Sequence, residues 1–383
     1  MIKSLRLLFS HKQARVAGLV FSINSILFSS WITRLPEIQD ELEISEGELG
    51  LALLGLPLGS LLIIPPIGWF IHRVGAGKAT LITGIFFCIL SPLPVLAPTY
   101  FLLILSIVFV GMTMGSMDVA MNAVAAAVEK RYSLNIMSSC HGMWSFGGML
   151  GAGSTGIMMG FNVPAYIQIP ILAVILLIFF LSQSSTLLSV KEDDTVSDVV
   201  LSIPTGPLVG LAVIGFCSML GEGAIADWTA VYLKNTLESS AFLAGLGYAG
   251  FSFSMAIGRF YGDRIIARWG ARRLVLIGGL IGLGGILFGL AVPYPYAVIT
   301  GFTFAGFGFS GIVPAIYGSA SRMPGRAPGA SIAAVASFGY LGMFFGPPVI
   351  GFVAEEFGLR IALGIVVVLM GFVVLLAGKA RFD

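Results

Sequence analysis

Long apolar runs follow one another along all 383 residues, separated by short breaks that carry charges, prolines or glycines. A helix needs about 20 apolar residues to cross the hydrocarbon core of a bilayer. The pattern therefore predicts an all-α integral membrane protein. Its twelve predicted transmembrane helices cover residues 12–34, 47–71, 79–96, 100–128, 134–160, 163–187, 206–234, 240–266, 273–292, 295–320, 327–354 and 358–379.

One break differs from the others in length and polarity. It covers residues 188–205, "LSVKEDDTVSDVVLSIPT", and leaves six predicted helices on each side. We therefore expect an N-terminal six-helix bundle over residues 1–187, a cytoplasmic linker over residues 188–205, and a C-terminal six-helix bundle over residues 206–383.

The two halves of the chain align when one is shifted by 195 residues. The same offset pairs positions in several helices: Arg73 with Arg268, Gly75 with Gly270, Gly111 with Gly306, and Gly147, Gly151 and Gly156 with Gly342, Gly346 and Gly351. Parallel repeats related about the membrane normal are one architecture of secondary transporters. The alternative is a duplicated membrane scaffold that transports nothing.

Composition agrees with a lipid-facing surface. The chain is 57% hydrophobic and 10% charged, whereas soluble domains are about 25% charged. A net charge of +2 gives no basic field for nucleic acid. No nucleophile–base pair, metal-ligand spacing or phosphate-binding loop is evident, so we expect neither an enzyme nor a cofactor. Three cysteines, Cys88, Cys140 and Cys217, fall in apolar segments and are expected to be buried thiols.

The distribution of basic residues predicts the orientation. With the N-terminus inside, seventeen lysines and arginines fall in inside segments and three, Arg34, Lys234 and Arg360, fall outside. Cytoplasmic loops carry the excess of these residues, so both termini are expected to be cytoplasmic. The basic N-terminus precedes a long apolar run with no small-residue cleavage site, and we interpret that run as the first transmembrane helix.

The helix over residues 100–128 contains an aspartate within an apolar run. Gly111, Gly115, Asp118 and Asn122 recur at i, i+4, i+7 and i+11 and so share one helical face. Ionisable side chains inside a membrane are costly and usually functional. Asp118 is therefore the leading candidate for a proton carrier. The alternative is a structural aspartate that is hydrogen-bonded to Asn122 or to a neighbouring helix.

Further polar groups in predicted helices complete the candidate site. His141 is expected at a depth similar to Asp118 and could form an Asp–His pair, although it could also be only packed. Glu222 is expected to face the cavity and Asp227 to be structural. Arg259 could pair with either acid, and Asp263 at i+4 is the local alternative. The expected proton-coupling residues are Asp118, Glu222 and His141, and the expected substrate contacts are Asn24, Asn122, Trp144 and Gln168.

Trp31 and Arg34 are expected near the outer membrane face. Trp31 is either an interfacial anchor or an aromatic wall for a ligand.

The loops after the second and eighth predicted helices resemble a motif of the major facilitator superfamily, G-x-x-x-D-R-x-G-R-K. The first copy runs from Gly68 to Lys78, with His72 at the position of the family aspartate, and the second contains Gly262-Asp263-Arg264. The resemblance implies the family's fold of twelve helices in two pseudo-symmetric bundles. It also implies a cytoplasmic gate formed by Arg73, Lys78, Asp263 and Arg268. The alternative is that these residues only determine topology.

Two finer resemblances concern the solute. "MDVAMNA" is similar to the acid-x-x-x-Asn segment of fucose–proton symporters, although the acid of the first helix is absent here. "SSWITRLPEIQ", "MDVAMN", "HGMWSFGG" and "EGAIADW" together resemble the YbjJ-type branch of bacterial inner-membrane transporters. In addition, "GMFFGPPVIG" resembles the family's antiporter motif, but it lies in the eleventh predicted helix instead of the fifth.

These observations predict a secondary transporter of a small polar solute, such as a sugar, that works by alternating access and is coupled to protons through Asp118. Its expected partners are the solute, protons and the lipid bilayer, and it is expected to function as a monomer. The alternative is a proton-driven exporter of amphipathic compounds, which a cavity rich in phenylalanine, such as one lined by "GFTFAGFGFSG", would favour.

Overall fold

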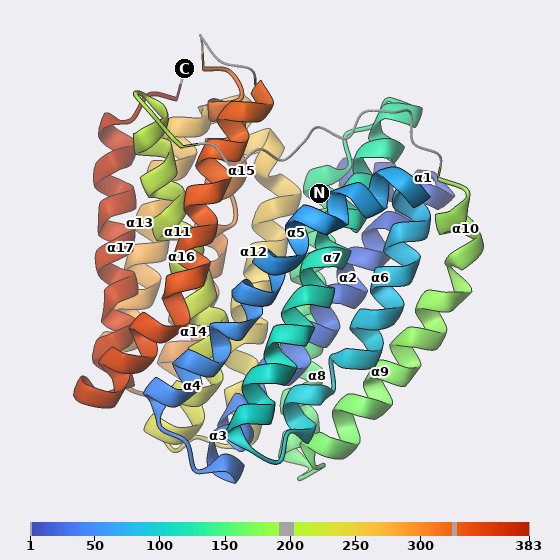
Figure 1. Cartoon of the computed structure of the whole chain (residues 1–383). Helices are drawn as coiled ribbons and strands as arrows, with labels where there is room; N and C mark the ends of the chain where they lie inside the picture. Colours follow the sequence, from blue (N-terminus) through green and yellow to red (C-terminus); the bar gives the residue numbers. More distant parts are fainter. Residues whose placement is uncertain (1, 191–202, 324–327, 383) are drawn as a thin grey trace. The chain divides into compact units, whose positions relative to one another are not determined.

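The computed structural model describes residues 2–190, 203–323 and 328–382 (Figure 1). These residues are almost all helical, and no strand occurs among them. They form two compact units, Met1–Ile44 with Leu51–Val196 and Ser45–Gly50 with Ser197–Asp383. Most of the predicted linker, residues 191–202, lies outside the described residues.

The first half of the chain contains ten α-helices and a 3₁₀ turn. They are α1 (Ile2–Ser10), α2 (Lys12–Ile32), α3 (Leu35–Leu42), α4 (Glu46–Leu53), α5 (Gly55–Val74), α6 (Ala76–Leu90), η1 (Leu93–Leu96), α7 (Tyr100–Tyr132), α8 (Met137–Gly160), α9 (Ala165–Ser182) and α10 (Ser184–Leu188). Within the first unit α2 packs along α8, α5 and α6 pack along α7, and α9 packs on α6.

The second half contains seven α-helices and a π turn among its described residues. They are α11 (Leu208–Val231), η2 (Tyr232–Thr236), α12 (Ala241–Trp269), α13 (Ala271–Ala291), α14 (Pro295–Phe309), α15 (Ile312–Ala320), α16 (Pro328–Phe357) and α17 (Leu359–Lys379). Here α11 packs along α16, α12 and α13 pack along α14, and α17 packs on α13. The second unit thus repeats the packing order of the first.

Eleven of the described helical segments are long and apolar enough to span a membrane. The remaining predicted helix is the fifth, which corresponds to α8 and has 24 residues but a sequence rich in glycine and serine. These small residues allow close packing against α2: a Cβ on Gly147 would clash with the Ser22 carbonyl oxygen, and a Cβ on Gly151 would clash with the Ile26 carbonyl oxygen. Small residues at such contacts are typical of membrane helix pairs.

Three local predictions were wrong. The segment after the first transmembrane helix, expected as a loop, forms α3, because Pro36 suits the first turn of a helix and Glu37 lies favourably near its N-terminus. Two helices expected as one piece are also divided: the second, over 47–71, between α4 and α5 at Leu54, and the tenth, over 295–320, between α14 and α15.

The 195-residue repeat is confirmed by equivalent backbone geometry in each unit. Gly75 and Gly270 both have positive φ, 86° and 79°, and their amides donate to the carbonyls of Ile71 and Ile266. Glycine adopts this conformation without the steric cost of a Cβ. The two copies of the loop motif therefore form the same tight turn.

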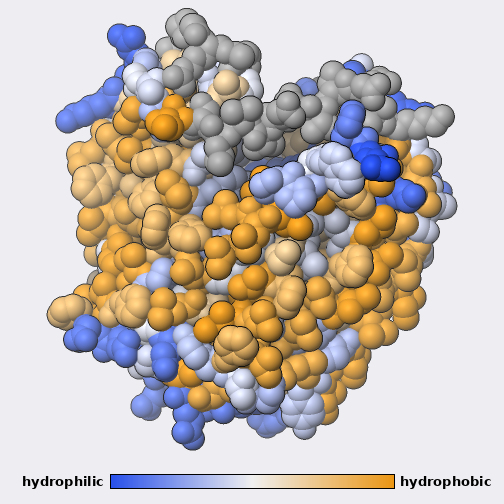
Figure 2. All heavy atoms as spheres, in the orientation of Figure 1, coloured by the Kyte–Doolittle hydropathy of each residue, from blue (hydrophilic) through white to orange (hydrophobic). Residues whose placement is uncertain are grey.

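Apolar side chains cover the middle of the helices on the face shown in Figure 2, and polar side chains gather near their ends. Large apolar residues are widely exposed, among them Trp69, Phe101, Ile178 and Leu375. Exposed apolar surface of this extent fits contact with lipid chains, as the composition predicts.

Candidate functional site

Asp118 lies near the middle of α7, and Asn122 follows it one turn later. The Asn122 Nδ2 donates to the Asp118 backbone oxygen at 2.9 Å and to its carboxylate Oδ1 at 3.3 Å. Both side chains keep part of their surface accessible. The predicted contact with Asn122 is therefore present, and Asp118 keeps part of its surface accessible beside it.

The glycines of the same helix allow α7 to approach α5 closely. Gly111 lies against the carbonyl oxygen of Leu56, and Gly115 lies against Ser60. The Ser60 Oγ donates to the Gly111 carbonyl at 3.0 Å. This close packing holds the helix that presents Asp118.

Asn24 connects three helices of the first unit. It is fully buried on α2, and its Oδ1 accepts from the Trp144 Nε1 of α8 at 3.1 Å. Its Nδ2 faces the Met117 Sδ of α7 at 3.5 Å. Asn24 thus fixes the position of Trp144 beside the residue that precedes Asp118.

Aromatic rings extend this contact along α2 and α8. Phe28 stacks on Trp144 with ring centroids 6.2 Å apart, and Phe21 meets the His141 ring edge-on at 5.2 Å. Trp144 and His141 are partly exposed. We call Phe21, Asn24, Phe28, His141 and Trp144 the α2–α8 cluster. The predicted pairing of His141 with Asp118 stays a prediction.

Arg34 is fully buried within the first unit, and its predicted position near the outer face stays a prediction. Its Nη1 donates to both carboxylate oxygens of Glu37 at 2.5 and 2.7 Å, its Nη2 donates to the Val163 carbonyl at 2.8 Å, and its Nε donates to the Gln168 Oε1 at 2.9 Å. Nη2 also donates to the Gln168 oxygen, so all five N–H donors of the guanidinium are used. This network joins the α2–α3 corner to the start of α9.

Gln168 was predicted to contact substrate, and both ends of its side chain have protein partners. Its oxygen accepts from Arg34, and its Nε2 donates to the Thr155 Oγ1 of α8 at 2.8 Å. Sequence reasoning missed this network, although the Arg34–Glu37 spacing of i, i+3 was a signal for it.

The second unit carries two acids on α11 with different surroundings. Glu222 Oε1 lies 3.2 Å from Arg259 Nη2 of α12, and both side chains are partly exposed. Glu222 is thus the partner of Arg259 that the structure describes, and the Asp263 side chain lies outside the described residues. Asp227 is 7% exposed.

The residues of the predicted cytoplasmic gate follow the two equivalent turns. Arg73 and Lys78 flank Gly75 and are exposed, as is Arg268 before Gly270. The Arg73 guanidinium lies over the Trp69 ring, 5.4 Å from its centroid. These positions suit either a gate or a determinant of topology.

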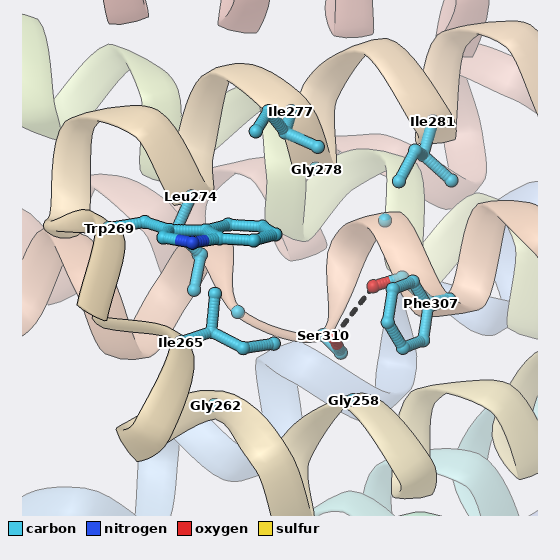
Figure 3. Close-up of a pocket in the computed structure, with 12 residues that line it drawn as sticks. Gly258, Gly262, Ile265, Trp269, Leu274, Ile277, Gly278, Ile281, Phe307 and Ser310 are labelled. Carbon is cyan, nitrogen blue, oxygen red and sulfur yellow. Dashed lines mark hydrogen bonds between the residues drawn. The ribbon is translucent and has the colours of Figure 1, made fainter. Parts of the chain in front are cut away.

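A pocket of about 50 Å³ in the second unit has the wrong chemistry for a polar solute (Figure 3). Trp269, Ile277, Ile281 and Phe307 line it, and the Ser310 hydroxyl donates to the carbonyl of Phe307 at 2.7 Å. No acidic or basic side chain is among its lining residues.

Comparison with known proteins gives relatives along nearly the whole chain. An uncharacterised MFS-type transporter of Yersinia pestis is 31% identical over 92% of this chain and 91% of its own length. The uncharacterised transporter y4wD of Sinorhizobium fredii is 34% identical over 93% and 95%. The membrane protein MosC of Rhizobium meliloti is 30% identical over 90% and 84%.

Solved structures share the fold at lower identity. A bacterial homologue of the human lysosomal transporter Spinster has a TM-score of 0.73 at 16% identity, covering 96% of this chain and 98% of that chain. The nucleoside transporter NupG has a TM-score of 0.68 at 16% identity, with coverage of 96% and 98%. The Major Facilitator Superfamily model matches residues 16–204 and 211–383, and the chain therefore belongs to this superfamily of membrane transporters.

Proposed function

We propose that this chain is a proton-coupled secondary transporter that moves a small, neutral, polar solute across the bacterial inner membrane by alternating access. Asp118 carries the proton in this proposal. The observation that supports it most is the position of Asp118, a partly exposed residue whose carboxylate accepts from Asn122 on a transmembrane helix next to the α2–α8 cluster. Ionisable groups in such positions mark ion and substrate pathways.

The chemistry of the α2–α8 cluster supports a neutral solute. The ring of Trp144 is partly exposed and stacked on Phe28, which suits the apolar face of a sugar ring. Asn122 and His141 add groups that can donate and accept hydrogen bonds. A few convergent polar groups on an aromatic wall are typical of small-molecule sites. The likeness to fucose–proton symporters in "MDVAMNA" points in the same direction.

Asn24 and Gln168 have supporting roles in this proposal. Asn24 is fully buried and positions Trp144. Gln168 connects Arg34 to Thr155 of α8 and so helps to hold α8, which carries Trp144 and His141, in position. Glu222 and His141 are further candidates for proton transfer, and Arg259 is the partner of Glu222.

The proposal extends to topology and gating. Both termini are cytoplasmic, the chain functions as a monomer, and the YbjJ-type resemblance supports a bacterial inner-membrane location. The basic loop residues Arg73, Lys78 and Arg268, together with Asp263, act at the cytoplasmic gate. The identical turns at Gly75 and Gly270 support a shared role for the two loops.

The experiment is transport into liposomes that contain the purified full-length chain, with an imposed pH gradient and a panel of radiolabelled neutral solutes and amphipathic cations. We expect one or more sugars or similar polar solutes to accumulate when the gradient is present. Asp118→Asn should abolish gradient-driven accumulation, because the amide cannot carry a proton. Solute exchange at equal pH on both sides should continue.

The matched control is Asp40→Asn, which makes the same chemical change at an exposed aspartate. It should accumulate solute as the unmodified chain does. Unchanged gradient-driven accumulation by Asp118→Asn would remove the coupling role of this residue. Expulsion of amphipathic cations without movement of polar solutes would favour an exporter instead. In the phenylalanine-rich stretch named for that alternative, Phe302 and Phe309 are core residues of the second unit, whereas Phe307 lines the apolar pocket of Figure 3.

A further inference from the structure

Asp227 on α11 is a buried carboxyl group that the proposed function does not use. Its side chain is 7% exposed, and it lies within the membrane-spanning segment Leu208–Thr236. Within the described parts of the chain, no hydrogen-bond donor or cation is paired with it. A buried charge is normally paired or hydrogen-bonded, because the membrane interior solvates it poorly. Glu222 and Arg34 each have a partner of opposite charge, whereas Asp227 has none among the described residues.

The titratable groups that face this region come from three helices. Tyr248 of α12 is 3% exposed and interacts electrostatically with Asp227, Glu222 and Arg259, and its hydroxyl is hydrogen-bonded to Ser252. The Arg259 guanidinium is held by Glu222 at 3.2 Å.

The third helix, α17, carries Arg360. Arg360 interacts electrostatically with Tyr232, and its Nε donates to the Leu290 carbonyl oxygen at 2.8 Å. Among the described residues, Asp227 therefore has a phenol and the Glu222–Arg259 ion pair near it, and no cation is paired with it.

Helix packing shared by the two halves does not explain this acid. The 195-residue offset places Ile32 at the position equivalent to Asp227, and Val313 at the position equivalent to Asp118. Asp118 and Asp227 thus each lie at a position where the other unit has an apolar residue. A residue that served only the common scaffold would need no such difference.

We propose that Asp227 is a second exchangeable proton site of the transporter, carried by the C-terminal unit and independent of Asp118. The charge state of an unpaired carboxyl group follows its access to water, and alternating access changes that access during each cycle. When water reaches it, the carboxylic acid releases its proton to water, and the carboxylate takes one up again before it is enclosed. This inference rests on the proposed function only for its role in coupling.

The test is infrared difference spectroscopy of the full-length chain in liposomes, recorded between about pH 5 and pH 9. Exposed aspartates stay ionised in this interval, because their usual pKa is about 3.9. We expect the carbonyl band of protonated carboxyl groups to contain separate components from the two acids. Asp227→Asn should remove one component, Asp118→Asn should remove the other, and the double variant should lose both.

Two further variants keep the result decisive. Asp40→Asn alters an exposed acid and should leave the band unchanged. Asp227→Glu retains a carboxyl group and should shift the frequency of the same component, which provides the readout if Asp227→Asn does not fold. An unchanged difference band in both Asp227 variants would overturn the inference. The spectra require no solute, so failure of the transport assay would not affect them.

Discussion

At the scale of single residues, Arg34 and Asp118 show that two charges inside membrane helices serve different purposes. Every N–H of the Arg34 guanidinium has an acceptor from Glu37, Gln168 or Val163. Such a residue cannot bind anything else without breaking its own network. Among the described residues, the Asp118 carboxylate instead has a side-chain hydrogen bond from Asn122 alone, and Asp118 keeps part of its surface accessible. We therefore assign Arg34 to the scaffold and propose Asp118 for function.

Removal of Arg34 should strongly destabilise the first unit. Arg34→Ala removes a fully buried guanidinium and its bonds to the Gln168 oxygen and the Val163 carbonyl, and each buried acceptor left unsatisfied costs about 1–3 kcal/mol. Arg34→Lys should have an intermediate effect, because an ammonium group has three donors in place of five. The measurement is the thermal unfolding midpoint of purified protein in detergent. Arg381→Ala, at an exposed position, is the control, and an Arg34→Ala midpoint equal to that of the control would contradict the scaffold role.

At the scale of helices, glycines allow specific pairs of helices to pack closely against each other. A Cβ on Gly111 would lie 2.2 Å from the Leu56 oxygen of α5, and a Cβ on Gly306 would lie 2.1 Å from the Phe251 oxygen of α12. All four residues in these two contacts are related by the 195-residue offset. The duplicated glycines therefore keep the same helix pair in contact in each unit, as small residues do elsewhere in membranes.

Alanine at either of these glycines should push the helix pair apart. We expect Gly111→Ala and Gly306→Ala to lower the unfolding midpoint, because a backbone oxygen cannot move away as a flexible side chain can. Gly371→Ala in α17 is the matched control, since a Cβ there meets nothing within 4 Å. This control should be neutral or slightly stabilising, because alanine favours a helix over glycine by up to about 1 kcal/mol. Equal midpoints for all three variants would show that these contacts do not hold the helices.

At the scale of the whole molecule, the chain combines an apolar surface with polar ends of its helices (Figure 2). The excess of lysine and arginine in alternate loops orients such a chain in the membrane. The three cysteines described by the structure, Cys88, Cys140 and Cys217, are buried. Introduced cysteines can therefore report the orientation without removal of the native ones.

Labelling of single cysteines by a membrane-impermeant maleimide should confirm the proposed orientation. Glu41→Cys, between the first two transmembrane segments, should react in intact cells. Ser133→Cys, between α7 and α8, should react only after the membrane is permeabilised. Both positions are exposed, so access depends on the side of the membrane. The unmodified chain is the blank, and the opposite labelling pattern would reverse the proposed topology.

Sequence periodicity predicted most of the helices and the repeat, because membrane helices must be long and apolar and duplicated glycines mark the same turns. It predicted less well where a few polar residues decide the local structure. The α3 helix was expected as a loop because its residues are polar and acidic, although Pro36 and Glu37 suit a helix start. For the site, the proximity of Asn122 to Asp118 followed from helical spacing alone.

By itself, the sequence determined that this protein is a duplicated set of membrane helices with very few charges inside. That conclusion follows from the apolar composition and from the spacing of the apolar runs, which can be read from neighbouring residues in the chain. Only the tertiary structure decided which polar groups have partners. Gln168 is held by Arg34 and Thr155, Glu222 is held by Arg259, and Asp227 is buried without a paired charge. These contacts join residues 13 to 134 positions apart, and no local pattern records which of them meet.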